Sequence, residues 1–155
     1  MKRLIVYAEE CAGCRQCEMV CSFKHERIFS PELSRVTVIK DDRNGLDYPV
    51  TCRNCSSCSP SENCPVSAIT KKSKSIVETN WSLCIGCGLC VDQCKYGAIK
   101  LNREQKPLIC NHCEGDPECV KRCPTNAIRY EESTEFTETV VDAFNRMKEE
   151  WGFNE

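Results

Sequence analysis

The sequence predicts an α+β fold of two small lobes, followed by an amphipathic helix at the C-terminal end. Three observations lead to this prediction. Sixteen of the 155 residues are cysteine, and they fall into four groups of four. A segment of the form Cys-x-x-x-Ala-Ile recurs at residues 64–69, 94–99 and 123–128, each time leading into a short strand-like stretch. After the last cysteine, apolar residues recur at helical spacing.

The four cysteine groups carry the chemistry of the chain. Two of them match the run Cys-x2-Cys-x2-Cys-x3-Cys: CAGCRQCEMVC at residues 11–21 and CIGCGLCVDQC at residues 84–94. In bacterial ferredoxins this run supplies three ligands to one [4Fe–4S] cluster and one ligand to its neighbour. We therefore expect four [4Fe–4S] clusters and a role in electron transfer. The sequence contains no nucleophile–base pair or phosphate-binding glycine loop that would indicate a catalytic residue.

Each half of a ferredoxin-like lobe is expected to place its ligands on a loop, followed by a short helical turn and a returning strand. Strands are expected at residues 4–7, 35–40 and 75–78, and short helical turns at residues 88–94 and 117–122. A tight turn is expected at Asn44-Gly45. The two lobes together occupy residues 1–130.

The C-terminal extension, residues 131–155, contains no cysteine. Its apolar residues fall on one face of a predicted helix, with charged residues elsewhere: Phe136, Val140, Val141, Phe144, Met147 and Trp151. Two interpretations stay open. The helix can cover the chain's own lobes, or it can dock against another subunit.

The overall charge and hydropathy exclude some classes of partner. The formal net charge is −2 and the pI is about 5.8, so no basic surface is expected to follow a phosphate backbone, and no nucleic-acid partner is expected. The apolar runs are too short to span a bilayer, and the N-terminal residues lack the features of a signal peptide. We therefore expect a cytoplasmic protein without a direct membrane span. Few large aliphatic side chains remain besides the thiols, so the apoprotein is expected to be largely unfolded.

Iron–sulfur ligation explains the cysteines better than zinc or disulfides do. In a reducing cytosol, cysteine is more often a metal ligand than half of a disulfide. Structural zinc uses two separated Cys-x-x-Cys pairs for one tetrahedral ion, whereas three cysteines at successive three-residue steps suit one face of a cubane. A zinc-binding module is therefore a distant alternative.

The spacing of the groups leaves their pairing open. The second and third groups share the Ala-Ile repeat, which favours one lobe built from residues 52–64 and 84–94. A sequential arrangement is the alternative, in which the first group joins the second and the third joins the fourth. In either arrangement, the fourth cysteine of each group crosses to the other cluster of its lobe.

Several motifs resemble those of the four-cluster iron–sulfur subunits of the dimethyl sulfoxide reductase type. They are CAGCRQCEMVCSFKHE, CIGCGLC, CNHCEGDPECVKRCP and the Cys-Pro pairs at residues 64–65 and 123–124. The resemblance implies an inner lobe of about residues 50–101, nested in an outer lobe of residues 1–49 and 102–130. One departure is the second group, CRNCSSCSPSENCP, in which Cys58 comes earlier than in the family pattern.

The nested pairing implies four ligand sets. Cluster 1 is held by Cys11, Cys14, Cys17 and Cys123, and cluster 2 by Cys21, Cys110, Cys113 and Cys119. Cluster 3 is held by Cys52, Cys55, Cys58 and Cys94, and cluster 4 by Cys64, Cys84, Cys87 and Cys90.

Within this family, the short chain with its CSFKHE and SPELSRV segments is most similar to the small polyferredoxin subunit of tungsten-containing aldehyde oxidoreductases. The resemblance implies an electron-transfer subunit from an anaerobe. Its partners would be a large catalytic redox subunit with a tungsten or molybdenum pterin and an external electron carrier. A free-standing soluble polyferredoxin is the alternative.

Three further residues are not expected to bind clusters. The two histidines, His25 and His112, are not needed as ligands, because sixteen thiols already satisfy four cubanes. Lys95 follows Cys94 at a position where Pro follows Cys64 and Cys123. An ammonium near an anionic cluster favours the reduced form, so we expect a raised reduction potential for the cluster that Cys94 binds.

Overall fold

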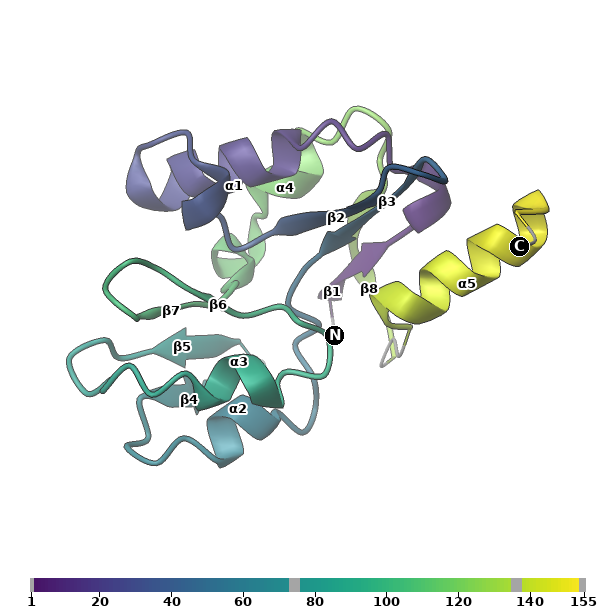
Figure 1. The fold of residues 1–155 in the computed structure, drawn as a ribbon. Helices are drawn as coiled ribbons and strands as arrows, with labels where there is room; N and C mark the ends of the chain where they lie inside the picture. The colour runs from purple at the N-terminus through teal and green to yellow at the C-terminus, as the bar shows by residue number, and fades with distance from the viewer. Residues whose placement is uncertain (1, 73–75, 135–137, 154–155) are drawn as a thin grey trace.

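The computed structural model of the chain describes residues 2–72, 76–134 and 138–153, and within them it combines short helices with two-stranded antiparallel sheets (Figure 1). The strands are β1 (Lys2–Val6), β2 (Thr37–Asp41), β3 (Leu46–Val50), β4 (Ile69–Lys71), β5 (Val77–Thr79), β6 (Lys100–Leu101), β7 (Pro107–Leu108) and β8 (Ile128–Glu132). The α-helices are α1 (Gln16–Glu26), α2 (Ser59–Glu62), α3 (Leu89–Gln93), α4 (Glu118–Lys121) and α5 (Val140–Trp151). Short 3-10 helices are η1 (Ala8–Glu10), η2 (Pro31–Leu33) and η3 (His112–Gly115). This content agrees with the expected α+β class.

The strand pairing brings distant parts of the chain together. β1 pairs with β8, with Leu4 opposite Tyr130, so the first and last strands lie side by side. The other sheets pair β2 with β3, β4 with β5, and β6 with β7. In Figure 1, α1, α4, β2 and β3 lie in the upper half of the molecule, whereas α2, α3, β4 and β5 lie in the lower half. The middle of the chain therefore occupies a different half from its two ends.

The local signals in the sequence correspond to observed elements with small shifts in their bounds. The expected strands at residues 4–7 and 35–40 correspond to β1 and β2, and the strand at 75–78 corresponds to β5, with Ser75 outside the described residues. The expected helical turns correspond to α3 and α4. The turn at Asn44-Gly45 joins β2 to β3: the Asn44 N–H donates to the Asp41 carbonyl at 3.1 Å, and Gly45 has a φ of +67°. Glycine adopts this left-handed conformation without steric cost.

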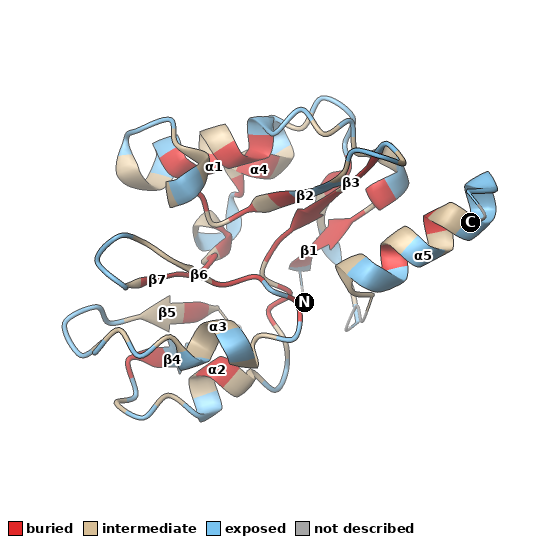
Figure 2. Ribbon diagram, in the orientation of Figure 1, coloured by how far each residue is buried: buried red, intermediate tan, exposed pale blue. Residues whose placement is uncertain are grey.

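Figure 2 shows where the buried residues lie along the ribbon, and two of the apolar clusters that they form are rich in thiols. One apolar cluster consists of Leu4, Val36, Val38 and Ile128 together with Cys17, Cys21, Cys110 and Cys119. A second consists of Ile69, Val77, Ile99 and Ile109, with thiols packed around it. All sixteen cysteines are free thiols. Cysteine sulfur therefore takes up much of the interior that aliphatic side chains would fill in a protein without cofactors.

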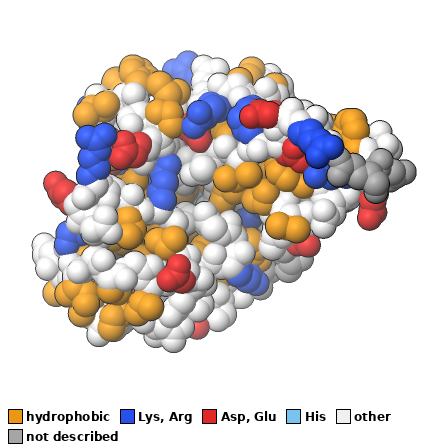
Figure 3. Space-filling view, in the orientation of Figure 1, with side chains coloured by type: hydrophobic (Ala, Val, Ile, Leu, Met, Phe, Trp, Pro, Cys, Tyr) orange, Lys and Arg blue, Asp and Glu red, His pale blue; other side chains and the backbone are white. Residues whose placement is uncertain are grey.

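The face of the molecule seen in Figure 3 carries charged side chains of both signs. Figure 3 shows Lys and Arg side chains interspersed with Asp and Glu on this face, and apolar side chains gathered at the lower left, over the half that carries α2 and β4. Within the described ranges, no helix has both the length and the apolar character needed to cross a bilayer.

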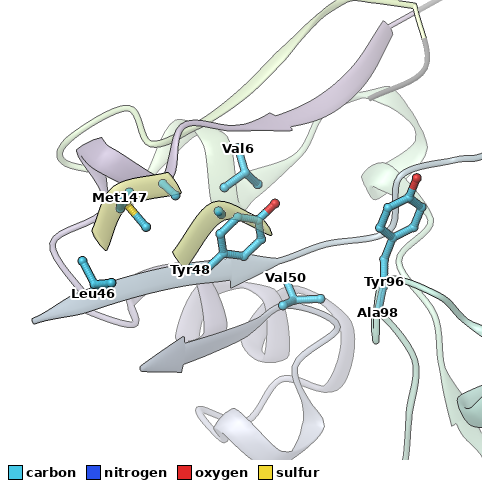
Figure 4. Packing of buried hydrophobic residues seen from close by; sticks show 9 residues of the cluster. Val6, Leu46, Tyr48, Val50, Tyr96, Ala98 and Met147 are labelled. Atoms are coloured by element: carbon cyan, nitrogen blue, oxygen red, sulfur yellow. The ribbon is translucent and has the colours of Figure 1, made fainter. Parts of the chain in front are cut away.

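Helix α5 packs on the chain's own strands. Ala143 and Met147 are fully buried in a cluster with Leu46 and Tyr48 of β3 (Figure 4). The helix begins with a capping box: the Thr139 Oγ1 accepts from the Asp142 N–H at 3.2 Å, and the Asp142 carboxylate accepts from the Thr139 N–H at 2.9 Å.

Only part of the expected apolar stripe of the C-terminal helix faces the core. Val140 and Phe144 are partly buried beside Met147, whereas Val141 and Trp151 are 67% and 48% exposed. Phe136 lies outside the described residues. The inner face of α5 therefore covers this chain, and its outer face leaves two large apolar side chains in solvent.

A cavity at Met147 is expected to loosen α5. The Met147→Ala substitution removes a fully buried side chain, so the free energy of opening of the helix is expected to fall by about 2–4 kcal/mol. Hydrogen–deuterium exchange of the α5 amides in the holoprotein measures this. The Val141→Ala variant is the matched control on the exposed face, with an expected change within about 0.5 kcal/mol. Equal protection in the two variants would contradict the packing described here.

Candidate metal centres

The sixteen thiols fall into four sets according to the cavities and core clusters that they line, and we number these sets as sites 1 to 4. Site 1 comprises Cys11, Cys14, Cys17 and Cys123, and site 2 comprises Cys21, Cys110, Cys113 and Cys119. Site 3 comprises Cys52, Cys55, Cys58 and Cys94, and site 4 comprises Cys64, Cys84, Cys87 and Cys90. The thiols of sites 1, 3 and 4 each line one cavity. The thiols of site 2 lie deeper, and three of them are less than a tenth exposed.

Site 1 is formed where the loop before α1 meets the loop after α4. Gly13 lies in the first of these loops with a φ of +59°, and a Cβ at this position would overlap the Asp47 carboxylate. Glycine adopts this φ without strain, whereas a Cβ here would also have to displace the ends of the Asp47 and Lys40 side chains. The buried Glu18 of α1 anchors the same region: its carboxylate accepts from the Val38 N–H at 2.8 Å and from the Arg15 Nε at 2.7 Å.

Site 3 is formed by the loop before α2 together with Cys94, which follows α3. Cys58, the position that departs from the family pattern, lines the same cavity as Cys52, Cys55 and Cys94. Lys71 of β4 holds the ligand loop, since its Nζ donates to the carbonyls of Cys55 and Ser56, each at 2.6 Å. An early Cys58 is therefore compatible with a four-thiol set.

Burial makes these thiols poor acids in the absence of a cation. Burial raises the pKa of Cys17 and of Cys52 to about 12, and it also raises the pKa of Cys110 and Cys119. A thiolate is the form that ligates iron, and a bound metal deprotonates its thiols outright. Sets of four thiols that include such buried members match a cationic iron–sulfur core, and binding such a core releases their protons.

Backbone N–H groups point at several sulfurs. The N–H groups of Arg35, Ala68, Gly86 and His112 donate to Cys21, Cys64, Cys84 and Cys110 at 3.3, 3.3, 3.4 and 3.4 Å. Burial alone would raise the pKa of Cys64, but the backbone N–H groups of residues 66 to 69 outweigh it and lower the pKa. Burial would likewise raise the pKa of Cys123. The backbone N–H groups of Ile128, Thr125 and Ala127 and the Thr125 hydroxyl outweigh it, so the pKa of Cys123 is lowered. The two Cys-Pro turns therefore form concave N–H surfaces that favour a thiolate.

The four sites follow one another in space. Sites 1 and 2 share a core cluster through Cys17, Cys21, Cys110 and Cys119. Sites 2 and 3 meet at Cys110 and Cys52. Burial is the main cause that raises the pKa of Cys110, and the nearby charge of Cys52 is the next, so these two thiols lie close together. Sites 3 and 4 pack around one apolar cluster, to which Cys58, Cys64, Cys90 and Cys94 all contribute. Cys14 of site 1 and Cys87 of site 4 are solvent-exposed. The order is therefore 1–2–3–4, with an exposed thiol at each end.

Site 4 reaches solvent through an apolar rim. Its cavity is lined by uncharged residues only, among them Ile85 and Leu89. Ile85 is 65% exposed, and Leu83 and Leu89 are also exposed. Large apolar side chains in solvent around a ligand loop are typical of a contact surface for another protein.

Polar side chains lie beside the thiols of sites 2 and 3. His25 Nε2 lies 3.8 Å from Cys113 Sγ, and burial, followed by the charge of Arg35, lowers the pKa of His25 to about 4. His112 is buried between sites 2 and 3, with its Nε2 3.2 Å from the Cys52 carbonyl. Arg53 is buried beside site 3. The contacts of His25 with Cys113 and of His112 with Cys52 join residues far apart in the chain, so local spacing does not indicate them, whereas Arg53 directly follows Cys52 in the sequence.

Within residues 2–72, 76–134 and 138–153, no three His, Cys, Asp or Glu side chains lie close enough together to hold a single metal ion. The sites are therefore defined by the cavities and core clusters that their thiols line, and the ligation of a cluster by each set stays a prediction.

Two family models described as 4Fe–4S binding domains match the chain, at residues 8–24 and at residues 77–100. The first match includes Cys11, Cys14, Cys17 and Cys21, and the second includes Cys84, Cys87, Cys90 and Cys94.

Several known proteins are similar to this chain over most of its length. A protein described as an uncharacterized ferredoxin of Methanocaldococcus jannaschii is 34% identical over 152 residues, which cover 95% of this chain and 85% of the relative. The polyferredoxin-like subunit of the aliphatic sulfonate oxidoreductase of Pyrococcus furiosus is 34% identical over 122 residues, 77% of this chain and 70% of the relative. The electron transport protein HydN of Escherichia coli is 33% identical over 155 residues, 83% of this chain and 87% of the relative.

A solved structure shares the fold. A chain of the active-site complex BamBC of benzoyl coenzyme A reductase superposes with a TM-score of 0.52 at 22% sequence identity, covering 96% of this chain and 88% of that chain. At this level of identity the likeness concerns the fold alone.

Removing one thiol of site 3 tests whether Cys58 is a ligand. The Cys58→Ser variant is expected to lose most of one cluster, so the iron content of the anaerobically purified protein falls from about sixteen toward about twelve atoms per chain. The Ser57→Ala variant is the control, because Ser57 lines the same cavity without offering a thiol. Wild-type iron content in both variants would exclude Cys58 as a ligand.

Proposed function

The chain belongs to the family of 4Fe–4S ferredoxin-like electron-transport proteins, and from this premise we propose that it is the electron-transfer subunit of a larger oxidoreductase complex. It holds four [4Fe–4S] clusters, one in each of sites 1 to 4, and relays single electrons between a large catalytic subunit and an external carrier. The ligand sets are those of the four sites, in the nested arrangement of an inner lobe within an outer lobe. The substrate chemistry belongs to the catalytic subunit.

The observation that carries this proposal is the unbroken order of the four thiol sets, with Cys14 and Cys87 exposed at opposite ends. When bound, each cluster supplies a one-electron couple whose potential depends on nearby charge, hydrogen bonds and solvent exposure. The chain's residues do the rest. The thiols fix the spacing of neighbouring sites, the N–H groups at Cys64 and Cys123 stabilise negative charge on sulfur, and the buried apolar residues keep water from the inner sites.

The partner is inferred from the relatives and from the surface. The Pyrococcus furiosus relative is named as a subunit of an oxidoreductase, which supports a catalytic partner for this chain too. We propose that the partner contains a tungsten or molybdenum pterin and that the complex is cytoplasmic. The apolar rim of site 4, formed by Leu83, Ile85 and Leu89, supplies a surface through which a redox protein can approach Cys87.

Anaerobic purification from the native source tests the proposal. We expect the chain to co-elute with a larger chain that contains tungsten or molybdenum, and to carry about sixteen iron atoms and as much acid-labile sulfide. Elution of the iron-loaded chain on its own would instead indicate a free-standing polyferredoxin. Zinc without sulfide would overturn the electron-transfer function itself.

Interruption of an inner site is expected to block the relay while the catalytic subunit still works. In a complex that carries the Cys58→Ser variant, substrate-dependent reduction of the external carrier is expected to fall to a small fraction of the wild-type rate, because electron transfer weakens steeply over the longer gap between sites 2 and 4. Reduction of the partner's own cofactor by substrate, followed in a single turnover, is expected to stay unchanged. If the iron assay shows that site 3 is empty and the rate of carrier reduction is still unchanged, electrons leave the complex by another route. A complex with Ser57→Ala serves as the control.

A further inference from the structure

Helix α1 carries a ligand of site 1, a ligand of site 2 and a histidine at regular spacing. Cys17, Cys21 and His25 follow one another at four-residue intervals within Gln16–Glu26. Side chains at this spacing lie on the same face of a helix. Cys17 and Cys21 are buried, and His25 is half-buried. The face that presents Cys21 to site 2 therefore presents His25 to the same region.

The His25 ring reaches a second thiol of site 2. Its Nε2 lies 3.8 Å from the Sγ of Cys113, a residue 88 positions further along the chain. Sulfur is a larger acceptor than oxygen, so a hydrogen bond to it is longer than the usual N–H···O distance of about 2.9 Å. The observed distance is therefore compatible with an N–H···S hydrogen bond.

Neighbouring contacts hold both partners in place. The Asn111 side chain accepts from the Cys113 N–H at 3.1 Å, in a loop where Cys113 itself has a left-handed φ of +48°. At the end of α1, the Glu26 carboxylate accepts from Arg35 Nη2 at 2.9 Å, and the Arg35 N–H donates to the Cys21 sulfur at 3.3 Å. The contact between His25 and Cys113 thus joins two anchored segments.

Cluster binding determines the direction of this hydrogen bond. Cysteine ligates iron as a thiolate, which has no S–H group and can only accept. The hydrogen must then be carried by Nε2 of His25. Both the neutral Nε2–H tautomer and the imidazolium provide it, so the hydrogen bond forms in either protonation state.

His25 also forms part of the wall of a polar cavity. The cavity has a volume of about 220 Å³ and is lined by His25, Arg35, Glu78 and Asn111 among other residues, but not by Cys113. Its size and polar lining make it suitable for water. The imidazole therefore lies at the boundary between this cavity and the Cys113 sulfur, and a much smaller side chain at position 25 would open a path for water.

We infer that His25 donates a hydrogen bond to the Cys113 sulfur and thereby raises the reduction potential of the cluster at site 2. This inference rests on the proposed function. An electron arrives from a neighbouring site, the cluster passes from the 2+ to the 1+ state, no covalent bond forms or breaks, and the proton stays on Nε2. The ligating sulfurs share the added negative charge, so the hydrogen bond is stronger in the reduced state and favours it.

Other donors to site 2 belong to the backbone. The N–H groups of Arg35 and His112 donate to the sulfurs of Cys21 and Cys110 at 3.3 and 3.4 Å. Substitution of a side chain leaves these donors in place. The hydrogen bond from His25 comes from a side chain, so it can be removed on its own and its effect on the potential can be measured.

Redox titration of the anaerobic holoprotein, followed by electron paramagnetic resonance, tests the inference. His25→Leu removes the donor and still fills the boundary of the cavity. It is expected to lower the equilibrium constant for reduction of the site 2 cluster about fivefold, which for a one-electron couple is about 40 mV. His25→Gln keeps an N–H donor and is expected to retain most of the wild-type potential. The site 2 signal is the one that disappears in the Cys119→Ala variant.

Lys24→Gln is the matched control for these two variants. Lys24 precedes His25 in α1 and is exposed, so water and salt screen its charge. Its loss is expected to shift the site 2 potential much less than the loss of the His25 donor.

Hyperfine spectroscopy gives a second readout, which a packing role would not produce. In fully reduced protein whose histidine rings are labelled with nitrogen-15, a weak coupling between a ring nitrogen and the cluster spin is expected. It is expected to be absent in His25→Leu and present in Lys24→Gln. The ring of His112, the other histidine, has its Nε2 3.2 Å from the Cys52 carbonyl oxygen and is expected to contribute little.

The outcomes separate this inference from the proposed function. A wild-type protein without four clusters would refute the function, whatever His25 does. With four clusters present, an unchanged site 2 potential in His25→Leu would overturn the inference. So would an equal downward shift in His25→Leu and His25→Gln, because that result would assign His25 a packing role only. If His25→Leu loses iron from site 2, the ring coupling in the wild-type protein decides: its presence supports the hydrogen bond, and its absence overturns the inference.

Discussion

Burial of thiols in convergent sets of four is the constraint on which the rest of this fold depends. Cys17, Cys21, Cys110 and Cys119 make up half of one core cluster, where most proteins of this size would place leucine or valine. These buried thiols resist ionisation, and iron takes them only as thiolates. Folding and cluster binding are therefore two aspects of one equilibrium. The strands and helices can stay short because the sites join distant segments directly.

The crossing cysteines show how local backbone geometry serves this constraint. Pro65 and Pro124 fix φ directly after Cys64 and Cys123. The backbone then turns so that the N–H groups of the following residues face the sulfur of Cys64 or Cys123. These N–H groups lower the pKa of both thiols, although burial acts in the opposite direction. At Cys64 and Cys123 the chain thus stabilises negative charge with backbone dipoles and needs no side-chain cation.

Site 3 is connected to the C-terminal helix through Arg53 and Tyr48. Met147 and Ala143 of α5 pack in one cluster with Tyr48, and the Tyr48 ring stacks on Arg53. Burial raises the pKa of Tyr48, so its hydroxyl stays neutral beside the guanidinium. Helix α5, which has no cysteines, therefore packs on the tyrosine that contacts Arg53 beside the site 3 thiols. Its inner face has a structural role in this chain, while Val141 and Trp151 remain exposed on its outer side.

The sequence by itself determined the chemistry, because ligand spacing within each cysteine group is a local property of the backbone. The Cys-x2-Cys-x2-Cys runs, the Ala-Ile repeats, the turn at Asn44-Gly45 and the apolar character of Val140, Phe144 and Met147 could all be read along the chain. Only the tertiary structure decided what depends on segments far apart in sequence. It brought Cys123 to Cys11 and Cys94 to Cys52, turned Val141 and Trp151 to solvent, and placed the Arg53 guanidinium between Tyr48 and Tyr96. Lys95 illustrates the difference: its position beside Cys94 suggests an electrostatic role, and only the structure shows that its side chain is exposed.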